Sequence, residues 1–436
     1  MNIVLLSGGS GKRLWPLSND IRSKQFIKMF RQPDGTYESM LKRVYRQIKS
    51  IDADSVITIA TSRTQEPAIV NHLGPDVNIS LEPCRRDTFP AIALAVAYLH
   101  DVCMVGEDEV AVVCPVDPYV DDSYFETVEK LSQQAAKGEA NLVLMGIEPT
   151  YPSEKYGYII PKDSAPVSLV DMFKEKPDEE TAKGYIAQGA LWNGGVFAFK
   201  LRYVLDQARA LLNYTTYQDL YDRYDTLTKI SFDYAVVEKE ERIQVLRYSG
   251  QWKDIGTWNT LIEAMDENTM GPVTLNEQCR DVYAINELDI PLLVMNMQNV
   301  IVAASPQGIL VTEPHASAHI KPFVDKIDKT ARFAEKTWGD FVVLDIGEMS
   351  LTARLNLKAG FHIRYHTHKI REESWTVVSG QGYAVIDDVK YPLRPGVSLQ
   401  LPVGSRHALY ADTKLTVIEV QVGEEISPDD ITYIRK

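Results

Sequence analysis

The chain has few cysteines and no cysteine pattern that would bind zinc. Its four cysteines never form a Cys-x-x-Cys pair, and three of them lie in or beside apolar segments. We therefore expect buried, reduced thiols and exclude a disulfide framework or a zinc knuckle. The four are Cys84, Cys103, Cys114 and Cys279.

The chain also lacks long apolar runs and any surplus of basic residues. No apolar stretch approaches the length that crosses a bilayer, so we expect no membrane partner. Because the first residues already have a strand pattern, we also expect no signal peptide and a cytoplasmic protein. Lys and Arg number 46 against 60 Asp and Glu, which gives a net charge of −14. Such an acidic surface repels nucleic acid, and an anionic substrate therefore needs a local group of cations or a metal.

The length and the pattern of apolar residues predict several domains. A chain of 436 residues exceeds one ordinary core. Within residues 1–265, apolar strand patterns at 55–61, 109–116 and 140–147 alternate with helical patterns such as 88–99. This alternation predicts an α/β domain with a mostly parallel sheet, whose ligands lie at the carboxyl ends of the strands.

The start of the chain carries the clearest chemical signal. A short apolar strand runs into a glycine-rich loop and then into basic residues, with Lys24 further along. Free backbone N–H groups and cations in one place suit a polyphosphate, although the spacing fits neither the dinucleotide fingerprint nor a Walker A loop. Taken alone, the loop is equally consistent with an ordinary glycine-rich turn. Its residues are Gly8, Gly9, Ser10, Gly11, Lys12 and Arg13.

Two aspartates far apart in the chain are candidate metal ligands. Asp117 ends an apolar strand ahead of Pro118, and Asp254 precedes Ile-Gly-Thr-Trp. Either carboxylate alone could simply cap a turn. Together they would give one Mg²⁺ two oxygen ligands and leave coordination positions for phosphate oxygens and water.

Seven motifs taken together resemble the sugar nucleotidylyltransferases, and within them the mannose-1-phosphate guanylyltransferases. The resemblance implies a Rossmann-like fold and transfer of a nucleotidyl group from a nucleoside triphosphate, GTP first, to a hexose 1-phosphate, mannose 1-phosphate first, which gives GDP-mannose and pyrophosphate. The motifs are GGSGKRLWPLS from residue 8, KQF from 24, EPCRRDT from 82, YGYI from 156, KEKP from 174, WNGG from 192 and DIGTW from 254.

The same resemblance implies roles for single residues. It implies catalytic roles for Arg13, Lys24, Asp117 and Asp254, with Mg²⁺ on the two aspartates. It implies nucleotide contacts from Gly8, Gly9, Ser10, Gly11, Lys12, Arg13, Glu82 and Arg86. It implies sugar-phosphate contacts from Gly157, Glu175, Lys176 and Asn193. The chain departs from the usual family residues at Lys12, Asp87, Pro118 and Gly194, so another nucleotide or another hexose stays open.

Beyond the α/β region the pattern changes twice. Residues 266–335 begin with a polar Gly-Pro break and continue as a small strand-rich connector, with a helix expected at 319–328. Residues 336–436 are rich in strands with regularly spaced turns, which suggests a small barrel or sandwich.

Histidines in the last region have the spacing of a metal site. His366 and His368 alternate along a predicted strand and therefore face the same side. With Glu373 and His407 their spacing resembles both cupin motifs, which implies a cupin β-barrel with these four ligands for a divalent transition metal, either Zn, Mn, Fe or Ni. His362 shares the predicted face but lies outside the motif, so we expect a surface or core histidine.

This region resembles the type II phosphomannose isomerase half that is fused to guanylyltransferases. That family has glutamine where this chain has His366. A second, mannose-6-phosphate isomerase activity therefore stays open beside the transferase activity. A non-catalytic sensor of nucleotide sugars and a homodimer are also left open.

Overall fold

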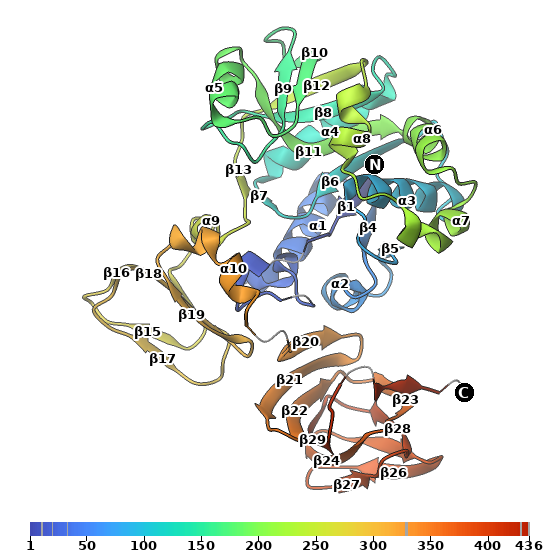
Figure 1. Cartoon of the computed structure of the whole chain (residues 1–436), viewed down its shortest axis with the longest axis vertical. Helices are drawn as coiled ribbons and strands as arrows, with labels where there is room; N and C mark the ends of the chain where they lie inside the picture. Colours follow the sequence, from blue (N-terminus) through green and yellow to red (C-terminus); the bar gives the residue numbers. More distant parts are fainter. Residues whose placement is uncertain (10–11, 20, 33, 328–329, 428–429, 435–436) are drawn as a thin grey trace. The chain divides into compact units, whose positions relative to one another are not determined.

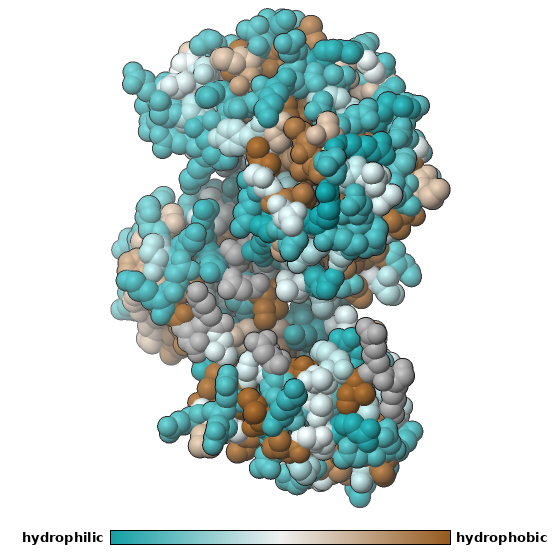
Figure 2. Space-filling model, turned by 45° about the vertical axis from the view of Figure 1, so that its right-hand side comes forward, coloured by the Kyte–Doolittle hydropathy of each residue, from teal (hydrophilic) through white to brown (hydrophobic). Residues whose placement is uncertain are grey.

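The computed structural model describes residues 1–9, 12–19, 21–32, 34–327, 330–427 and 430–434. Ser10 and Gly11, two of the predicted nucleotide ligands, lie outside these residues. The chain forms two compact units, the first made of Met1–Gly9, Lys24–Glu66 and His72–Asp266, and the second of Ser10–Ser23, Pro67–Asn71 and Glu267–Lys436. In the described part of the chain, every helix is too short or too polar to span a membrane. The face in Figure 2 is mostly hydrophilic, in keeping with a composition that is 24% charged.

A nine-stranded mixed sheet forms the core of the first unit (Figure 1), in the order β5-β4-β1-β6-β11-β8-β12-β10-β9. The expected parallel pairing joins β5, β4, β1 and β6, and also β8 and β12, whereas β11, β10 and β9 pair antiparallel. The strands are β1 (Asn2–Leu6), β4 (Val56–Ser62), β5 (Asn78–Glu82), β6 (Val110–Pro115), β8 (Leu142–Ile147), β9 (Tyr158–Pro161), β10 (Val167–Lys174), β11 (Leu191–Lys200) and β12 (Ile243–Tyr248).

Helices pack on this sheet. The helix α3 is apolar on nearly all sides and buries ten residues against α6, β1, β4 and β5, as an apolar helix inside a domain does. It starts at Asp87, whose side chain accepts the Thr88 N–H and whose backbone has the left-handed φ of 70°, unlike the extended backbone of an ordinary N-cap. The helices of the first unit are α1 (Met40–Ile51), α3 (Thr88–Asp101), α4 (Asp122–Ala136), α5 (Glu179–Ala187), α6 (Leu201–Leu212), α7 (Tyr217–Asp222), α8 (Phe232–Ala235) and α9 (Trp258–Ile262). Most of α2 (Glu66–Leu73) is the segment Pro67–Asn71 of the second unit.

A small second sheet positions the candidate site. Strand β7 (Pro118–Val120) pairs antiparallel with β13 (Trp252–Asp254), and the register sets Asp254 opposite Pro118. Strand β7 follows directly after β6, and β13 follows after β12. The pair therefore joins the carboxyl ends of two strands that are not neighbours in the main sheet, where α/β proteins bind their ligands.

The connector in the second unit is a short coil of parallel strands. Strands β14, β16 and β18 pair in parallel in one sheet, β15 and β17 pair in parallel in another, and β19 closes antiparallel on β18. Val282, Ala284, Val294 and Val302 form its small core. The strands are β14 (Thr269–Met270), β15 (Val273–Leu275), β16 (Arg280–Asn286), β17 (Leu292–Val294), β18 (Gln298–Ser305) and β19 (Gly308–Thr312).

The helix expected at 319–328 is shorter in the structure. A 3₁₀ turn at Ala316–His319 precedes α10, which covers only Lys321–Val324. Pro322 stands in the first turn of α10, where its missing N–H costs nothing, so the helix starts there and not at His319.

The last region consists of two antiparallel sheets around one core. Leu357, Trp375, Leu409 and Val417, contributed by both sheets, are buried together, which agrees with the expected cupin fold. One sheet has β20 (Phe333–Lys336), β21 (Gly339–Ile346), β22 (Ser350–Leu357), β29 (Leu415–Gly423), β24 (Arg371–Ser379) and β27 (Ser398–Leu401). The other has β26 (Val389–Leu393), β25 (Gly382–Ile386), β28 (Arg406–Ala411), β23 (His362–Thr367) and β30 (Thr432–Tyr433).

Candidate functional site

The carboxylates of Asp117 and Asp254 converge on one cation. The Lys24 ammonium lies 2.9 Å from an Asp117 oxygen and 3.7 Å from an Asp254 oxygen, and it donates to the Ile255 carbonyl at 2.8 Å. The two carboxylates are 39% and 40% exposed. Three of the predicted catalytic residues therefore lie together, and two carboxylates that share one cation in an open position are a donor set that suits Mg²⁺.

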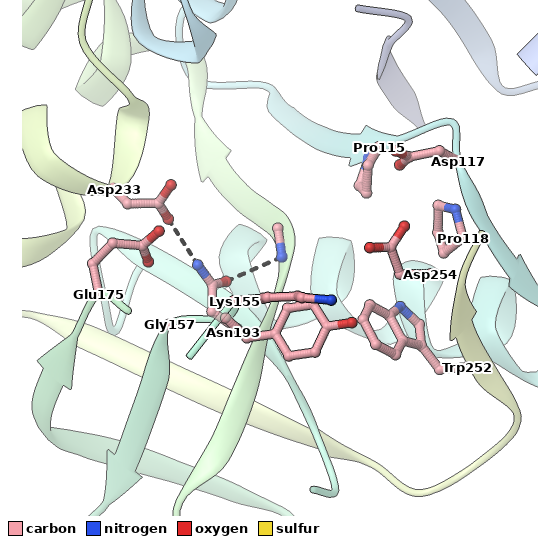
Figure 3. Close-up of a pocket in the computed structure, with 13 residues that line it drawn as sticks. Pro115, Asp117, Pro118, Lys155, Gly157, Glu175, Asn193, Asp233, Trp252 and Asp254 are labelled. Atoms are coloured by element: carbon pink, nitrogen blue, oxygen red, sulfur yellow. Dashed lines mark hydrogen bonds between the residues drawn. The ribbon is translucent and has the colours of Figure 1, made fainter. Parts of the chain in front are cut away.

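These carboxylates line a cavity of about 230 Å³. Figure 3 shows Asp117 and Asp254 toward one end of the cavity and Glu175 and Asp233 toward the other, with Asn193 near the second pair. Gly157 also lines the cavity. The structure thus brings three of the four predicted sugar-phosphate residues into one pocket with the predicted metal ligands.

Asn193 is held in one orientation by three hydrogen bonds. Its side chain donates to Asp233 at 2.7 Å and accepts the Gly195 N–H at 3.1 Å, while its backbone N–H donates to the Gly157 carbonyl at 2.8 Å. A Cβ at position 157 would lie 2.5 Å from a carboxylate oxygen of Glu175, so a side chain at position 157 would displace this carboxylate from its place in the cavity.

The end of the cavity near Glu175 and Asp233 carries both negative and positive side chains. Burial, and then the nearby Glu175 charge, raises the pKa of Asp233 to about 6. Lys176 forms an ion pair with Glu175, and this partner raises the Lys176 pKa although burial works against the charge. Lys176 also has a left-handed backbone at φ 47°, a strained conformation for a lysine and a common feature of functional sites.

An aromatic cluster forms one wall of the cavity. The Tyr156 ring lies 4.9 Å from Trp192 and 5.4 Å from Trp252, measured between ring centroids. Trp192 is buried and donates its indole N–H to the Tyr158 hydroxyl. Burial, helped by the Asp254 charge, raises the pKa of Tyr156, so this wall offers neutral rings to a ligand.

The predicted nucleotide residues of the first unit lie at the ends of β1 and β5. Gly9 has φ 108°, a conformation that favours glycine, and its carbonyl accepts a hydrogen bond from Arg85. Glu82 is buried, which raises its pKa, and it accepts the Tyr224 hydroxyl at 2.7 Å. Arg86 donates to the Tyr224 carbonyl at 3.3 Å. Two of these predicted ligands therefore contact one tyrosine, which ties them to the segment between α7 and α8.

The basic pair after the glycine loop belongs to the second unit. Lys12 and Arg13 form the 3₁₀ turn Lys12–Leu14. The Lys12 ammonium lies 3.2 Å from an Asp325 oxygen, at the end of α10. The sequence alone gave no sign of this acidic partner.

The second unit contains a cluster of three buried histidines. The ligand atoms of His366, His368 and His407 lie within 4.8 Å of one another. The outer ring nitrogens of His366 and His407 contact the carbonyls of Arg364 and Ser405, which turns the other nitrogens toward the centre. The His407 Nε2 is buried and, among the described residues, makes no hydrogen bond.

Glu373 completes this cluster. Its carboxylate lies 2.9 Å from the His368 Nε2 and 3.6 Å from the His407 Nε2. Burial lowers the pKa of His366 to about 4 and that of His407 to about 3, so both rings are neutral at pH 7. Neutral imidazoles with one carboxylate are a ligand set for a divalent transition metal, so the residues present fit the predicted group.

Three side chains around Glu373 were not predicted as part of this site. Trp375 donates its indole N–H to Glu373 at 3.2 Å and to Glu419 at 3.1 Å, and Arg371 donates to Glu373 at 3.2 Å. Glu419 is buried opposite Trp375 in the β24–β29 register, and burial with the Glu373 charge raises its pKa to about 8. Only its place in an alternating strand pattern could have identified this glutamate.

His362 lies outside the cluster. The pairing of β23 with β28 shifts register between Ile363 and His366, so the simple alternation that put His362 on the same face fails. His362 is exposed and stacks on Tyr410 at 4.9 Å. It is therefore a surface histidine.

Two further polar residues line the cavity of the first unit without having been predicted. They are Lys155 and Asp233. Lys155 directly precedes the aromatic-glycine motif, and Asp233 lies in α8 (Phe232–Ala235). The sequence feature that could have identified Lys155 as a site residue is therefore its position next to this motif.

Two family models match the chain. The Nucleotidyl transferase model matches residues 2–270, and the Mannose-6-phosphate isomerase C-terminal model matches residues 325–436. The first match covers more than half of the chain.

Curated relatives and a solved structure agree with these matches. The Xanthan biosynthesis protein XanB of Xanthomonas campestris is 30% identical over 98% of this chain and 97% of its own length. A mannose-1-phosphate guanylyltransferase of Salmonella montevideo is 29% identical, with the same coverage. A crystal structure from Thermus thermophilus, described as a mannose-1-phosphate geranyltransferase, is 28% identical with a TM-score of 0.61 and covers 74% of this chain and 98% of that chain.

Proposed function

The chain belongs to the nucleotidyl transferase family, and from this premise we propose that it transfers a guanylyl group from GTP to mannose 1-phosphate. The products are GDP-mannose and pyrophosphate. The observation that carries the proposal is the convergence of Asp117 and Asp254 on the Lys24 ammonium, beside a cavity with sugar-binding groups. The names of relatives such as the Salmonella enzyme support the choice of substrates.

The acceptor sugar occupies the end of the cavity formed by Asn193, Glu175 and Gly157. Glu175 accepts hydrogen bonds from sugar hydroxyls, and Lys176 neutralises the phosphate. The aromatic wall packs on the sugar ring. These groups orient one phosphate oxygen of the acceptor for attack.

The reaction is an in-line displacement at the α-phosphorus. The acceptor oxygen forms a new bond to phosphorus while the bond to pyrophosphate breaks, with no covalent enzyme intermediate. Lys24 and Arg13 draw charge from the triphosphate, and Gly8, Gly9, Lys12, Glu82 and Arg86 hold the nucleotide. Asp117 and Asp254 would hold Mg²⁺, which neutralises phosphate charge when bound. Catalysis rests on position and charge.

A substrate panel tests this proposal. We expect pyrophosphate release with GTP and mannose 1-phosphate to exceed that with ATP, UTP, dTTP or glucose 1-phosphate by at least about tenfold. Release with another pair alone would replace the proposed substrates. Binding of nucleotide sugars without any pyrophosphate release would favour a sensor.

The histidine cluster supports a second candidate function. We propose that His366, His368, Glu373 and His407 hold Zn, Mn, Fe or Ni, which as a Lewis acid polarises a sugar carbonyl. Interconversion of mannose 6-phosphate and fructose 6-phosphate by the full chain with each metal added tests this activity. In this scheme residues 1–265 transfer the nucleotide, 266–335 connect and 336–436 bind the metal.

A further inference from the structure

Residues 271–324 have no assigned role. Neither family model matches them, and the proposed reaction uses none of their side chains. They contain most of the connector coil, from β15 to β19, and α10. The contacts of this coil with the start of the chain point to a role.

The segment Ser10–Ser23 belongs to the second unit together with the connector. We call its described residues, 12–19 and 21–23, the signature arm. In sequence the arm lies between Gly9 and Lys24, the cation between the two carboxylates, and it contains Lys12 and Arg13. Any element that fixes the arm therefore fixes a stretch that carries two predicted triphosphate ligands.

A bidentate ion pair joins the arm to the connector. The two terminal nitrogens of Arg22 lie 2.6 Å and 2.9 Å from the two oxygens of Glu287. Their side chains are only 11% and 18% exposed, and the guanidinium also lies 5.2 Å from the centre of the Phe333 ring. Glu287 itself is fixed by its N–H, which donates to the Ala304 carbonyl. A shielded, two-pronged pair of this kind holds its geometry better than an exposed one.

Two further contacts involve the Trp-Pro part of the motif. The buried Ser305 hydroxyl donates to the Pro16 carbonyl at 2.7 Å. A Cβ at position 308 would lie 2.5 Å from Trp15, so the indole packs directly on the backbone of Gly308. Trp15 and Pro16 are thus bound by strands β18 and β19 and their turn.

The arm is also braced internally. The Asn19 side chain accepts the N–H groups of Ile21 and Arg22 at 2.8 Å and 2.6 Å. Its amide donates to Gln307 at 3.3 Å. The arm is therefore a short, internally braced segment with four separate attachments to the connector, through Trp15, Pro16, Asn19 and Arg22.

From these contacts we infer that the connector is a positioning element for the triphosphate loop, and that Glu287, Ser305 and Gly308 are positioning residues. Part of the arm then serves as an anchor, because Trp15, Pro16 and Arg22 contact the connector. The inference rests on the proposed function only for its kinetic consequence. The attachment itself can be measured without turnover.

Charge exchange in the full chain tests the attachment. We expect Arg22→Glu and Glu287→Arg each to speed hydrogen exchange of the arm amides at least about tenfold and to raise the KM for GTP about tenfold, with the KM for mannose 1-phosphate changed less than about twofold. The double variant should restore most of both values. Asp289→Asn is the matched control, since Asp289 is in the same connector but pairs with Arg354.

The outcomes separate the inference from the proposed function. Unchanged exchange of the arm in folded single variants, equal rises in both KM values, or no recovery in a folded double variant would each overturn the inference. If the charge variants do not fold, Ser305→Ala gives the smaller version of the same exchange and KM test. Faster arm exchange in a protein whose wild type transfers no nucleotide would keep the attachment and reject the transferase assignment.

Discussion

The two candidate metal sites of this chain are built in opposite ways. Asp117 directly precedes β7 and Asp254 ends β13, so both lie at one end of a two-stranded sheet of three-residue strands, and both are about 40% exposed. Of the second set, His366, Glu373 and His407 lie in strands β23, β24 and β28 of the two large sheets, His368 directly follows β23, and each of the four is at most 6% exposed. In the first site a lysine of the chain lies between the carboxylates, whereas in the second the ring nitrogens face one another.

This contrast indicates two kinds of metal use. An open carboxylate pair suits an ion that arrives and leaves with a phosphate ligand, as Mg²⁺ does, because water and phosphate complete its coordination. Buried histidines with fixed outer hydrogen bonds suit an ion that stays.

The largest effect is expected at the open site. Asp254→Asn should lower the rate of transfer about 1,000-fold and leave the unfolding temperature unchanged, because one carboxylate is lost at an exposed position. Steady-state pyrophosphate release and thermal unfolding measure the two quantities. Glu263→Gln, which disrupts only the pair with the neighbouring Lys253, is the control. A near wild-type rate in Asp254→Asn would remove this residue from the mechanism.

The next effect separates the two sites. His368→Ala should weaken binding of a transition metal at least about 100-fold, measured as metal per chain after dialysis, while the transfer rate stays within about twofold. His362→Ala, on the same strand but outside the cluster, should retain the metal. Equal metal content in the two variants would contradict the assigned ligand set.

A smaller effect belongs to the sugar end of the open site. Lys176→Ala should raise the KM for the sugar phosphate about tenfold with little change in the KM for the triphosphate, since one charged contact is lost. Lys183→Ala, which breaks an exposed pair with Glu179, should change neither value. A rise in the triphosphate KM alone would place Lys176 with the nucleotide.

The smallest effect is a pH dependence of stability. The pKa of Asp233 is about 6 in the folded chain against an ordinary value of 3.8, so the folded state binds a proton that the unfolded state does not between these values. Stability should therefore rise as the pH falls from about 6 to about 4, by at most about 3 kcal/mol. Asp233→Asn should flatten this part of the stability curve. Asp178→Asn is the control of opposite sign, because hydrogen bonds lower the Asp178 pKa.

Much of the open site could be predicted because its signal is local. Asp117 follows an apolar strand, whose carboxyl end is where such sheets bind ligands, and Asp254 begins the DIGTW motif. The β7–β13 pairing that joins them could not be read, because three-residue strands give no measurable alternation. The approach of Gly157 to Glu175 likewise depends on two strands that meet only in the folded chain.

The buried site shows where a regular pattern misleads. Alternation identified His366 and His368 correctly as neighbours. The same alternation rule fails for His362, because the pairing of β23 with β28 shifts register between Ile363 and His366. The ion pair between Arg22 and Glu287 could not be predicted for another reason. The two residues are 265 positions apart in the sequence, and neither belongs to a recognisable pattern.

The register of β7 with β13 limits how this gene can change in length. Asp254 lies opposite Pro118 and Lys253 opposite Tyr119. One inserted codon in the turn between β12 and β13 would slide the strand by a residue and present the lysine where the carboxylate now stands. The proposed magnesium site would then repel the ion. We therefore expect insertions and deletions to be tolerated less in this turn than elsewhere on the surface.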